Sequence, residues 1–362
     1  MQNPILSSLQ EIIDKQSRTF DNKELQQQLK EILLELDPGE DTTIFVPPAS
    51  PGAFHIGQYT QQAIAHTAEK KGKHSGCLPT GLKTLDSLMG GGFEKSELIV
   101  LGARPGMGKT TLMLTILNHL TSKKKLPALC LSTYDEAPKL IARLQAMMPG
   151  KSNTGPDSGA GEEEWDKYLD SVRSLEKLPL WIDDTRPAYI ERILDACRWM
   201  KTEHGIRFIT IWDLQSIRTA QQFRTRDLEL GYICRRLREL TRELGLPILA
   251  VSQLNRTVEY RGGTRRPQLT DLRDSGHIEM EADKVLFLYR PEYYTIDIDE
   301  MGNSTKYIAE LHLARNQTGK TGIILLKRDP EFTRFLDFDG YSADINISPG
   351  RMADLDENDI PF

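Results

Sequence analysis

The stretch ELIVLGARPGMGKTTLMLTI, residues 97–116, is the feature that most limits what this chain can fold into. An apolar run typical of a buried strand enters a glycine-rich loop, and an apolar helical pattern follows the loop. Gly106 and Gly108 allow backbone N–H groups to close around phosphate oxygens, and the helix start adds positive potential. The usual first glycine of such a loop is replaced by Ala103. A glycine turn with an incidental lysine is the alternative, but strand, loop and helix together favour a phosphate-binding loop.

The residues after these glycines predict the chemistry of the loop. Lys109 can reach the β and γ phosphates of a nucleoside triphosphate, and the Thr110 hydroxyl can bind Mg²⁺. We therefore predict an ATP site with Mg²⁺ as cofactor. The predicted nucleotide-binding residues are Arg104, Pro105, Gly106, Met107, Gly108, Lys109, Thr110 and Thr111.

Apolar runs alternate with helical patterns from residue 81 onward. The runs predict buried strands at residues 98–101, 128–132, 180–182, 208–212, 247–252 and 285–289. The patterns between them predict helices at residues 110–120, 189–203 and 227–244. Such alternation indicates an α/β fold with a mostly parallel, twisted sheet flanked by helices. Shorter runs at 312–314, 322–327 and 332–338 predict antiparallel additions to that sheet.

Other parts of the chain differ in character from this region. Apolar residues at helical spacing predict a small helical hairpin over residues 1–37, too small to be stable alone. Residues 38–77 read as a linker with a polar helix at about 57–71, and residues 150–163 as a flexible insertion. We assign residues 78–340 to the α/β domain and 341–362 to an acidic flexible tail.

Composition and charge indicate where the protein is located and what it can bind. The net charge of −6 gives no general indication of nucleic-acid binding, so any such binding requires a local patch. No apolar run approaches the roughly 20 residues that cross a bilayer, and no secretory signal is recognisable. The four cysteines have no metal-ligand spacing, and three of them, Cys130, Cys197 and Cys234, fall at apolar positions. We expect buried, reduced thiols, a cytoplasmic protein and no membrane contact.

With these motifs in order, the chain resembles the C-terminal motor domain of DnaB-type replicative helicases, a hexameric RecA-like P-loop NTPase. The resemblance runs from LPTGLKTLDSLMGGG, residues 78–92, to FTRFLDF, residues 332–338. Supporting stretches are ARPGMGKT, LPLWIDDT, RRLRELTRELGLPILAVSQLNRTVE, LTDLRDSGHIEMEADKVLFLYRPEYY and TGKTG.

The resemblance implies roles for further residues. Gln253 would sense the γ-phosphate; the alternative is that it satisfies a buried backbone group. The loop containing Arg273, Asp274 and Gly276 would line a central channel and hold single-stranded DNA. The alternative for Arg273 is a surface pair with Asp271 or Asp274. The helix at 57–71 would dock on the neighbouring subunit of a homo-hexamer, or else be simply solvated.

The chain departs from the family at the residue that activates water. A gapless count places Tyr134 where the family has a glutamate, and Asp135 and Glu136 follow directly. Tyrosine is a poor base at neutral pH, since its ordinary pKa is about 10. Either the loop brings in Glu136 or Asp135 as the catalytic carboxylate, or hydrolysis is crippled.

A second departure lies in FITIWDLQSI, residues 208–217. Aligned on the residues after it, the family's metal-side aspartate becomes Trp212; aligned on the apolar run, it becomes Asp213. Because side chains alternate along a strand, a one-residue slip turns Asp213 away from the nucleotide unless the strand has already ended. We favour Asp213 as the metal-side carboxylate, with Trp212 packed on the helix layer.

The third departure concerns the arginine that reaches the neighbour's γ-phosphate. In ARNQTGKTG, the gapless count places Gln317 in that position and Arg315 beside it. Arg315 is our candidate for the trans-acting role, with Lys320 behind it. The alternative is that both are plain surface charges on a turn.

Two further stretches suggest binding partners. TAQQFRTRDLEL, residues 219–230, stands where the family has a channel loop, and Arg224 and Arg226 are candidate contacts to DNA phosphates. The alternative is a solvated charge cluster. The end DLDENDIPF is similar to the acidic tips of bacterial single-stranded DNA-binding proteins. It predicts a replication-protein partner for the Ile-Pro-Phe end, or else is an ordinary acidic tail.

Together these features predict a ring-forming ATP-dependent DNA helicase or translocase acting on single-stranded DNA in replication. The rival reading is an ATP-binding, hydrolysis-deficient switch or loader, which Tyr134, Trp212 and Gln317 favour. A RecA-like ATPase that forms a filament is a third possibility. The family's large N-terminal domain has no counterpart in these motifs, so contact with primase by that route is not expected.

Overall fold

The computed structural model describes residues 76–147, 161–272, 276–331 and 333–340. All described residues belong to one compact unit of the chain, His74–Phe362. The predicted hairpin, the helix at about 57–71 and the acidic tail lie outside the described residues, as do Arg273 and Asp274.

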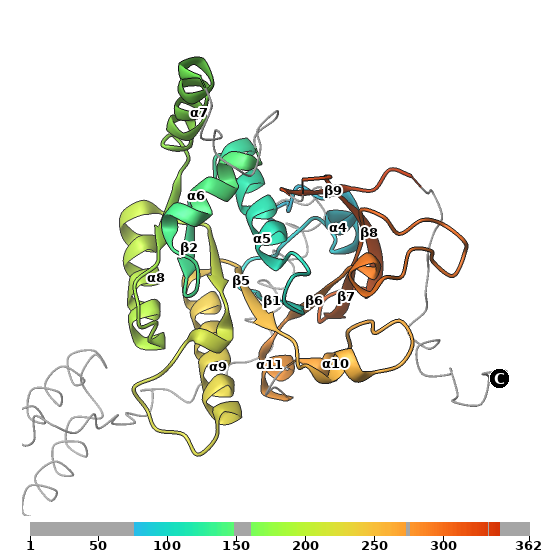
Figure 1. The fold of residues 1–362 in the computed structure, drawn as a ribbon. Coiled ribbons are helices and arrows are strands. Elements are labelled where there is room, and N and C mark those ends of the chain that lie inside the picture. The colour runs from blue at the N-terminus through green and yellow to red at the C-terminus, as the bar shows by residue number, and fades with distance from the viewer. Residues whose placement is uncertain (1–75, 148–160, 273–275, 332, 341–362) are drawn as a thin grey trace, which may run out of the picture. The chain divides into compact units, whose positions relative to one another are not determined.

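Nine strands of the described residues form one sheet in the order β3-β2-β4-β5-β1-β6-β7-β8-β9 (Figure 1). The first six strands pair in parallel, and β7, β8 and β9 extend the sheet in antiparallel fashion, as predicted. The strands are β1 (Leu98–Ala103), β2 (Ala128–Ser132), β3 (Leu180–Asp183), β4 (Phe208–Trp212), β5 (Ile248–Gln253), β6 (Lys284–Tyr289), β7 (Ile308–Asn316), β8 (Gly322–Arg328) and β9 (Phe335–Asp337).

The described helices cover both faces of the sheet. They are α4 (Lys83–Leu88), α5 (Lys109–Asn118), α6 (Ala137–Ala146), α7 (Glu162–Leu175), α8 (Ile190–His204), α9 (Arg226–Leu244), α10 (Thr257–Tyr260) and α11 (Gly276–Glu281). Shorter turns are the π-helical η1 (His119–Lys123) and the 3₁₀ turns η2 (Leu214–Ser216), η3 (Leu269–Asp271) and η4 (Pro291–Tyr294). The helices α4, α6, α7, α10 and α11 were not predicted, and α7 begins inside the expected insertion, at Glu162.

The observed strands agree with the predicted ones to within two residues, except that β7 is longer and β9 is shorter than expected. Two polar residues, Glu310 and His312, interrupt the apolar pattern of β7. The strand continues through them because both side chains are buried against polar partners. The carboxylate of Glu310 accepts two hydrogen bonds from Arg266 at 2.9 Å, and it lies 2.7 Å from His312 Nε2. Paired in this way, charged side chains can occupy the interior of a strand.

The core lies in two layers, one on each face of the sheet. On one face α5 and α6 bury Leu112, Met113, Leu117, Leu140 and Leu144. On the other face α8 and α9 bury the apolar faces of the predicted helices, including Ile193, Cys197, Ile233 and Leu237, and α11 adds Ile278. Each such side chain contributes about 1.5–3 kcal/mol when it leaves water. Because helices pack on both faces, the sheet is held rigidly, and so is the edge where the carboxyl ends of its parallel strands lie side by side.

The cysteines behave as predicted in the described residues. Cys130, Cys197 and Cys234 are buried and form no disulfide. Burial raises the pKa of Cys130 to about 11 and of Cys197 and Cys234 to about 12. Thiols of this kind are inert packing groups.

Candidate nucleotide-binding site

The loop between β1 and α5 has the backbone that phosphate binding requires. Gly106 and Gly108 have φ angles of +80° and +102°, a region that glycine adopts without cost. Gly108 is also the residue from which α5 starts, so the free N–H groups of the helix begin at the loop. Ala103, in place of the usual glycine, is the fully buried last residue of β1, where its methyl group fits the core.

Lys109 lies folded against the loop that carries it. Its Nζ donates hydrogen bonds to the carbonyl oxygens of Ala103 at 2.8 Å and Arg104 at 3.2 Å. Burial lowers the pKa of Lys109 to about 8; nearby Asp213 opposes this shift and Arg104 adds to it. A triphosphate arriving at the loop would replace these carbonyl contacts and restore the ordinary pKa of the ammonium.

This arrangement predicts a pH dependence of nucleotide affinity. With a pKa of about 8, Lys109 is charged below pH 8 in the empty site and loses its proton as the pH rises above that value. Affinity should be constant near pH 7 and fall by up to about tenfold per pH unit above pH 8. Titration calorimetry with ATP should also show proton uptake at pH 8.5. Lys109→Arg, which does not titrate, should bind with a flat profile; an equal slope in this variant would contradict the assignment.

The loop forms one wall of a cavity of about 710 Å³ at the carboxyl edge of the parallel strands. Open α/β sheets usually bind their ligands at this edge. The cavity is lined by Pro105, Gly106, Gly108, Lys109, Thr110, Thr111, Leu114, Tyr134, Asp135, Arg143, Met147, Trp212, Asp213, Val251, Gln253 and Thr333. Most of the predicted nucleotide-binding residues are therefore brought together.

Two predicted nucleotide-binding side chains do not line the cavity. Arg104 is only 6% exposed and turns beneath the loop, where it donates to Glu259 at 2.7 and 2.8 Å and to the Leu254 carbonyl at 2.9 Å. Met107 is buried in the core. Arg104 therefore holds the loop against the end of β5, a role that its position in the motif does not reveal.

The end of β4 contains both candidates for the metal-side position. Trp212 is 9% exposed and packs in the cluster beneath α5 and α6, as predicted, while also lining the cavity. Asp213 follows with a φ of +67°, so the chain turns sharply after the strand. Its carboxylate accepts hydrogen bonds from Gln215 N at 3.2 Å and Ser216 Oγ at 3.0 Å. The turn brings Asp213 to the cavity despite the one-residue slip.

The end of β2 distinguishes the two candidate catalytic carboxylates. Asp135 is nearly buried, lines the cavity and lies 3.4 Å from Arg143 Nη1, another lining residue. Glu136 is the N-cap of α6 and does not line the cavity. Tyr134, in the slot of the family's glutamate, is 68% exposed at the cavity mouth. The choice between Asp135 and Glu136 therefore depends on where α6 begins.

The predicted γ-phosphate sensor lies directly beside the phosphate loop. Gln253 ends β5 in register with Ala103 of β1, and it lines the cavity. Its backbone is held by Gln215, whose side chain accepts from Gln253 N at 3.0 Å and donates to Gln253 O at 3.3 Å and Ser252 Oγ at 2.9 Å. Gln215 is a positioning residue that sequence reasoning missed. Its place directly after Asp213 and Leu214 was the only available signal.

The cavity contains oxygen donors suited to Mg²⁺. Thr110, Asp135 and Asp213 supply a hydroxyl and two carboxylates, and Mg²⁺ typically takes one or two carboxylates together with waters and phosphate oxygens. No group of three or more His, Cys, Asp or Glu residues in the described residues forms a metal cluster. The donors therefore fit a metal that arrives with its triphosphate.

Arg315 lies near the amino ends of the parallel strands, whereas the cavity lies at their carboxyl ends. It pairs with Val285 near the start of β6. At about 3.3 Å per residue, the six residues of β6 separate these ends by roughly 17 Å. Arg315 Nη1 is 4.0 Å from Glu279, and with its amide suitably oriented Gln317 accepts from Arg315 Nη2 at 3.2 Å. Arg315 therefore cannot reach the cavity of its own chain.

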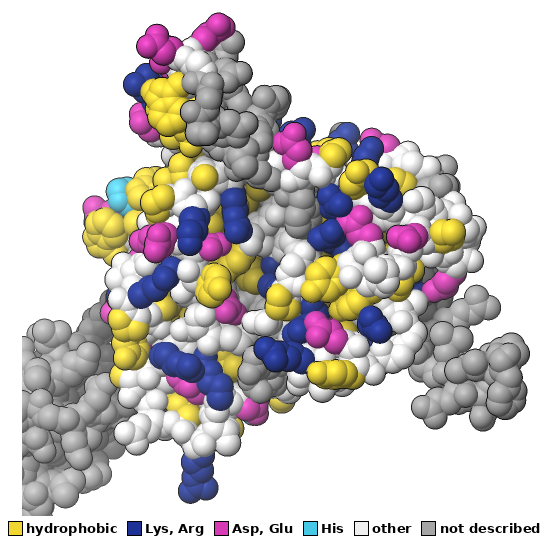
Figure 2. Space-filling model, in the orientation of Figure 1, with side chains coloured by type: hydrophobic (Ala, Val, Ile, Leu, Met, Phe, Trp, Pro, Cys, Tyr) yellow, Lys and Arg dark blue, Asp and Glu magenta, His cyan; other side chains and the backbone are white. Residues whose placement is uncertain are grey.

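The predicted DNA-binding arginines differ in their surroundings. Arg224 is exposed and lines a second pocket of about 470 Å³ with Arg218 and Phe223. Arg226 lines this pocket too, but its Nη2 donates to the carbonyls of Gln215 at 2.8 Å and Ile217 at 2.7 Å. On the face that Figure 2 shows, Lys and Arg side chains lie in small groups among acidic ones.

The rest of the predicted DNA site lies only partly within the described residues. Gly276 begins α11, and a side chain there would meet no atom within 4 Å. Arg273 and Asp274 precede it outside the described residues. Among the described helices, none is both long and apolar enough to cross a bilayer.

Comparison with known proteins confirms the resemblance found in the sequence. The DnaB-like helicase C terminal domain family matches residues 77–337. "Replicative DNA helicase DnaC" of Bacillus subtilis (strain 168) is 33% identical over 296 residues, which are 80% of this chain and 63% of that protein. "Replicative DNA helicase DnaB" of Geobacillus stearothermophilus is 34% identical over 275 residues, 75% of this chain and 59% of that protein. The chain thus spans about three fifths of the length of these curated relatives.

Two solved structures superpose on this chain over most of its length. One structure, of an ATPase domain, superposes with a TM-score of 0.70 at 26% identity, covering 80% of this chain and 100% of that chain. Another, of a DnaB-like replicative helicase, has a TM-score of 0.69 at 24% identity and covers 93% of this chain and 76% of that chain. The chain therefore belongs to the DnaB-like helicase C-terminal domain family and has its RecA-like ATPase fold.

Proposed function

We propose that this protein is a ring-forming, ATP-dependent DNA helicase or translocase that acts on single-stranded DNA in replication. One observation carries the proposal. The phosphate loop and Gln253 form a site at one edge of the sheet, while the candidate arginine, Arg315, lies at the other edge. These two halves can meet only between subunits arranged head to tail, which is the contact that generates closed rings or filaments.

Each residue of the site has a role in this proposal. Lys109 binds the β and γ phosphates, and Thr110 and Asp213 hold the Mg²⁺ that offsets the charge of the triphosphate. Gln253 senses the γ-phosphate, and Arg315 of a neighbouring subunit stabilises the negative charge that develops during transfer. Leu114, Met147 and Thr333, which line the cavity outside the loop itself, contact the base and sugar in this proposal.

Arg224 is the described residue best placed to bind single-stranded DNA. It is exposed beside Phe223 in the second pocket, whereas Arg226 is used to hold η2. The loop with Arg273, Asp274 and Gly276 completes the proposed channel. Binding through phosphates predicts little sequence preference and a strong loss of affinity with salt.

The direct test is steady-state ATP hydrolysis by purified protein with Mg²⁺, with and without single-stranded DNA. We expect turnover that DNA stimulates, followed by unwinding of a forked duplex. Mass photometry with nucleotide should show a hexamer; an open series of larger species would indicate a filament. Absence of both turnover and nucleotide binding would refute the proposal.

A second candidate function, an ATP-bound switch or loader that scarcely hydrolyses ATP, rests on a specific observation. Trp212 lies in the cavity wall at the metal-side slot, and Tyr134 stands in the slot of the catalytic glutamate. Tight binding of ATP without DNA-stimulated turnover would select this function.

We also propose a cytoplasmic location and a replication-protein partner for the Ile-Pro-Phe tail.

The water-activating carboxylate can be identified with a matched pair of variants. We predict that Asp135→Asn lowers turnover by about 10²-fold or more, because Asp135 lines the cavity and a positioned base contributes about 10²–10⁴-fold. Glu136→Gln, one residue away but outside the lining, should stay within about threefold of the wild type. The opposite order of effects would show that the loop shifts Glu136 into the site when nucleotide binds.

A further inference from the structure

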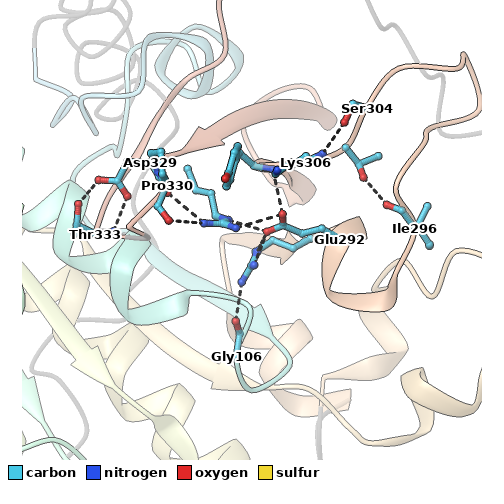
Figure 3. A network of polar contacts seen from close by, with 12 residues as sticks. Gly106, Glu292, Ile296, Ser304, Lys306, Asp329, Pro330 and Thr333 are labelled. Carbon is cyan, nitrogen blue, oxygen red and sulfur yellow. Dashed lines mark hydrogen bonds and ion pairs between the residues drawn. The ribbon is translucent and has the colours of Figure 1, made fainter.

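A partly buried carboxylate outside the predicted site joins two arginines, one beside it in the chain and one on β8. Glu292, in η4, is 15% exposed. Its Oε1 accepts hydrogen bonds from Arg290 Nε at 3.2 Å and Arg328 Nε at 2.7 Å, and its Oε2 accepts from Tyr307 N at 3.1 Å. Figure 3 shows Glu292 at the centre of this network.

One arm of the network reaches the phosphate loop from outside the cavity. Arg290 Nη1 donates to the carbonyl oxygen of Gly106 at 3.0 Å (Figure 3). The neighbouring Tyr293 covers the same glycine so closely that a Cβ on Gly106 would lie 3.0 Å from its ring. The outer side of the loop is thus held by η4.

The other arm reaches another lining residue of the cavity, Thr333. Arg328 Nη1 donates to the carbonyl oxygens of Asp329 at 3.2 Å and Pro330 at 3.3 Å. The carboxylate of Asp329 in turn accepts hydrogen bonds from Thr333 N at 2.6 Å and from the Thr333 hydroxyl (Figure 3). Thr333 lines the cavity, so this arm ends at a wall of the nucleotide site.

The circuit closes through the helix that carries the phosphate loop. Phe335 N, at the start of β9, donates to Thr115 Oγ1 of α5 at 3.3 Å. The wall containing Thr333 is therefore tied to α5 on one side and, through Glu292, to the Gly106 carbonyl on the other. Because it contacts both the phosphate loop and the lining residue Thr333, the network connects two parts of the cavity wall and is more than an isolated ion pair.

Glu292 is ionised. Burial alone would raise its pKa, but hydrogen bonds from Arg328 and Arg290 outweigh this effect and lower the pKa to about 2. The group is a carboxylate at every pH at which the protein would be studied. Its two partners are also 12% and 14% exposed, so removal of the carboxylate would leave two poorly hydrated guanidinium groups without their shared acceptor.

We propose that Glu292 is a positioning residue for nucleotide binding, which sets the spacing between the phosphate loop and the wall that carries Thr333. This inference rests on the proposed nucleotide site. It predicts a specific pattern of affinity. A ligand that touches both walls needs the spacing, whereas a ligand that touches only the phosphate loop does not.

The test compares two ligands on the full chain. Binding of mant-ATP with Mg²⁺ and of inorganic tripolyphosphate with Mg²⁺ is measured for the wild type and for Glu292→Gln. We expect the Kd for mant-ATP to rise about tenfold and that for tripolyphosphate to change by less than about twofold. With ATP as substrate, KM should rise while kcat changes little.

A matched control and a second variant make the result decisive. Glu243→Gln removes a carboxylate that pairs with Arg198 through two hydrogen bonds of 2.8 and 2.9 Å, between α8 and α9 and away from the cavity; it should bind both ligands normally. Arg328→Lys keeps the charge, but one ammonium replaces the three guanidinium nitrogens that donate to Glu292 and to the Asp329 and Pro330 carbonyls. It should reproduce the ATP-selective loss, and it serves if Glu292→Gln fails to fold.

The outcomes separate this inference from the function on which it rests. An equal loss for both ligands, or no loss in folded protein, would overturn the spacing role while leaving the nucleotide site intact. Failure of the wild type to bind mant-ATP would overturn both. An ATP-selective loss in Glu292→Gln or Arg328→Lys, absent from Glu243→Gln, would support the inference.

Discussion

Lys109→Ala should lower ATP turnover by about 10²–10³-fold or more, the loss typical of removing one preorganised charge from a reaction centre. Lys109 is the cation of the phosphate loop, and it lies poised on the carbonyls of Ala103 and Arg104. Alanine removes the group that would follow the β and γ phosphates into the transition state. Steady-state hydrolysis with Mg²⁺ and single-stranded DNA measures the effect.

The control for this variant is Lys139→Ala, which removes an exposed lysine from α6. It should hydrolyse ATP at the wild-type rate. Melting temperature should be equal or higher in Lys109→Ala, because the variant loses a charge whose pKa is already lowered by burial. Equal turnover in wild type and Lys109→Ala would mean that the measured activity is not that of this site, and it would favour the switch.

Arg315→Ala should retain ATP binding but lose about 10³-fold or more in turnover, as expected for a trans-acting arginine. Its position at the edge of the sheet opposite the cavity excludes action within one subunit. Mixed rings provide the sharper test. In a ring of Arg315→Ala and Lys109→Ala subunits, some interfaces combine an intact Lys109 with an intact Arg315, so two inactive variants should regain part of the activity.

The matched control mixes Lys109→Ala with the double variant Lys109→Ala/Arg315→Ala. No interface in that ring has an intact lysine, so no activity should return. If Arg315→Ala alone turns over normally, the trans-acting residue is elsewhere, and Lys320 is the next candidate. If neither variant nor wild type turns over while ATP binds tightly, the hydrolysis-deficient switch is the better description.

The sequence predicted best the features that depend on residues close together along the chain. β2 and β4 have the predicted boundaries, because each is a short apolar run bounded by polar or turn residues. The phosphate loop required only its glycines and the elements on either side. The buried stripes of α8 and α9 followed from apolar residues that recur every three or four positions.

The sequence did not determine which residue at the end of a strand or the start of a helix faces the cavity. Asp213 reaches the cavity because the chain adopts a positive φ directly after β4, a local turn that strand alternation cannot anticipate. Asp135 rather than Glu136 lines the cavity because α6 begins at Ala137. In both cases a shift of one residue decides which side chain faces the ligand.

By itself, then, the sequence determined the α/β architecture, the phosphate loop and the family, since these depend on periodicity and on motifs within a few residues. Only the tertiary structure decided that Arg104 is bound to Glu259, that Arg226 holds η2 and that Glu292 links Gly106 to the wall of Thr333. The physical reason is that a side chain's partner is set by which strands and loops the fold brings together. Arg104 and Glu259 are 155 residues apart, and no local pattern encodes their meeting.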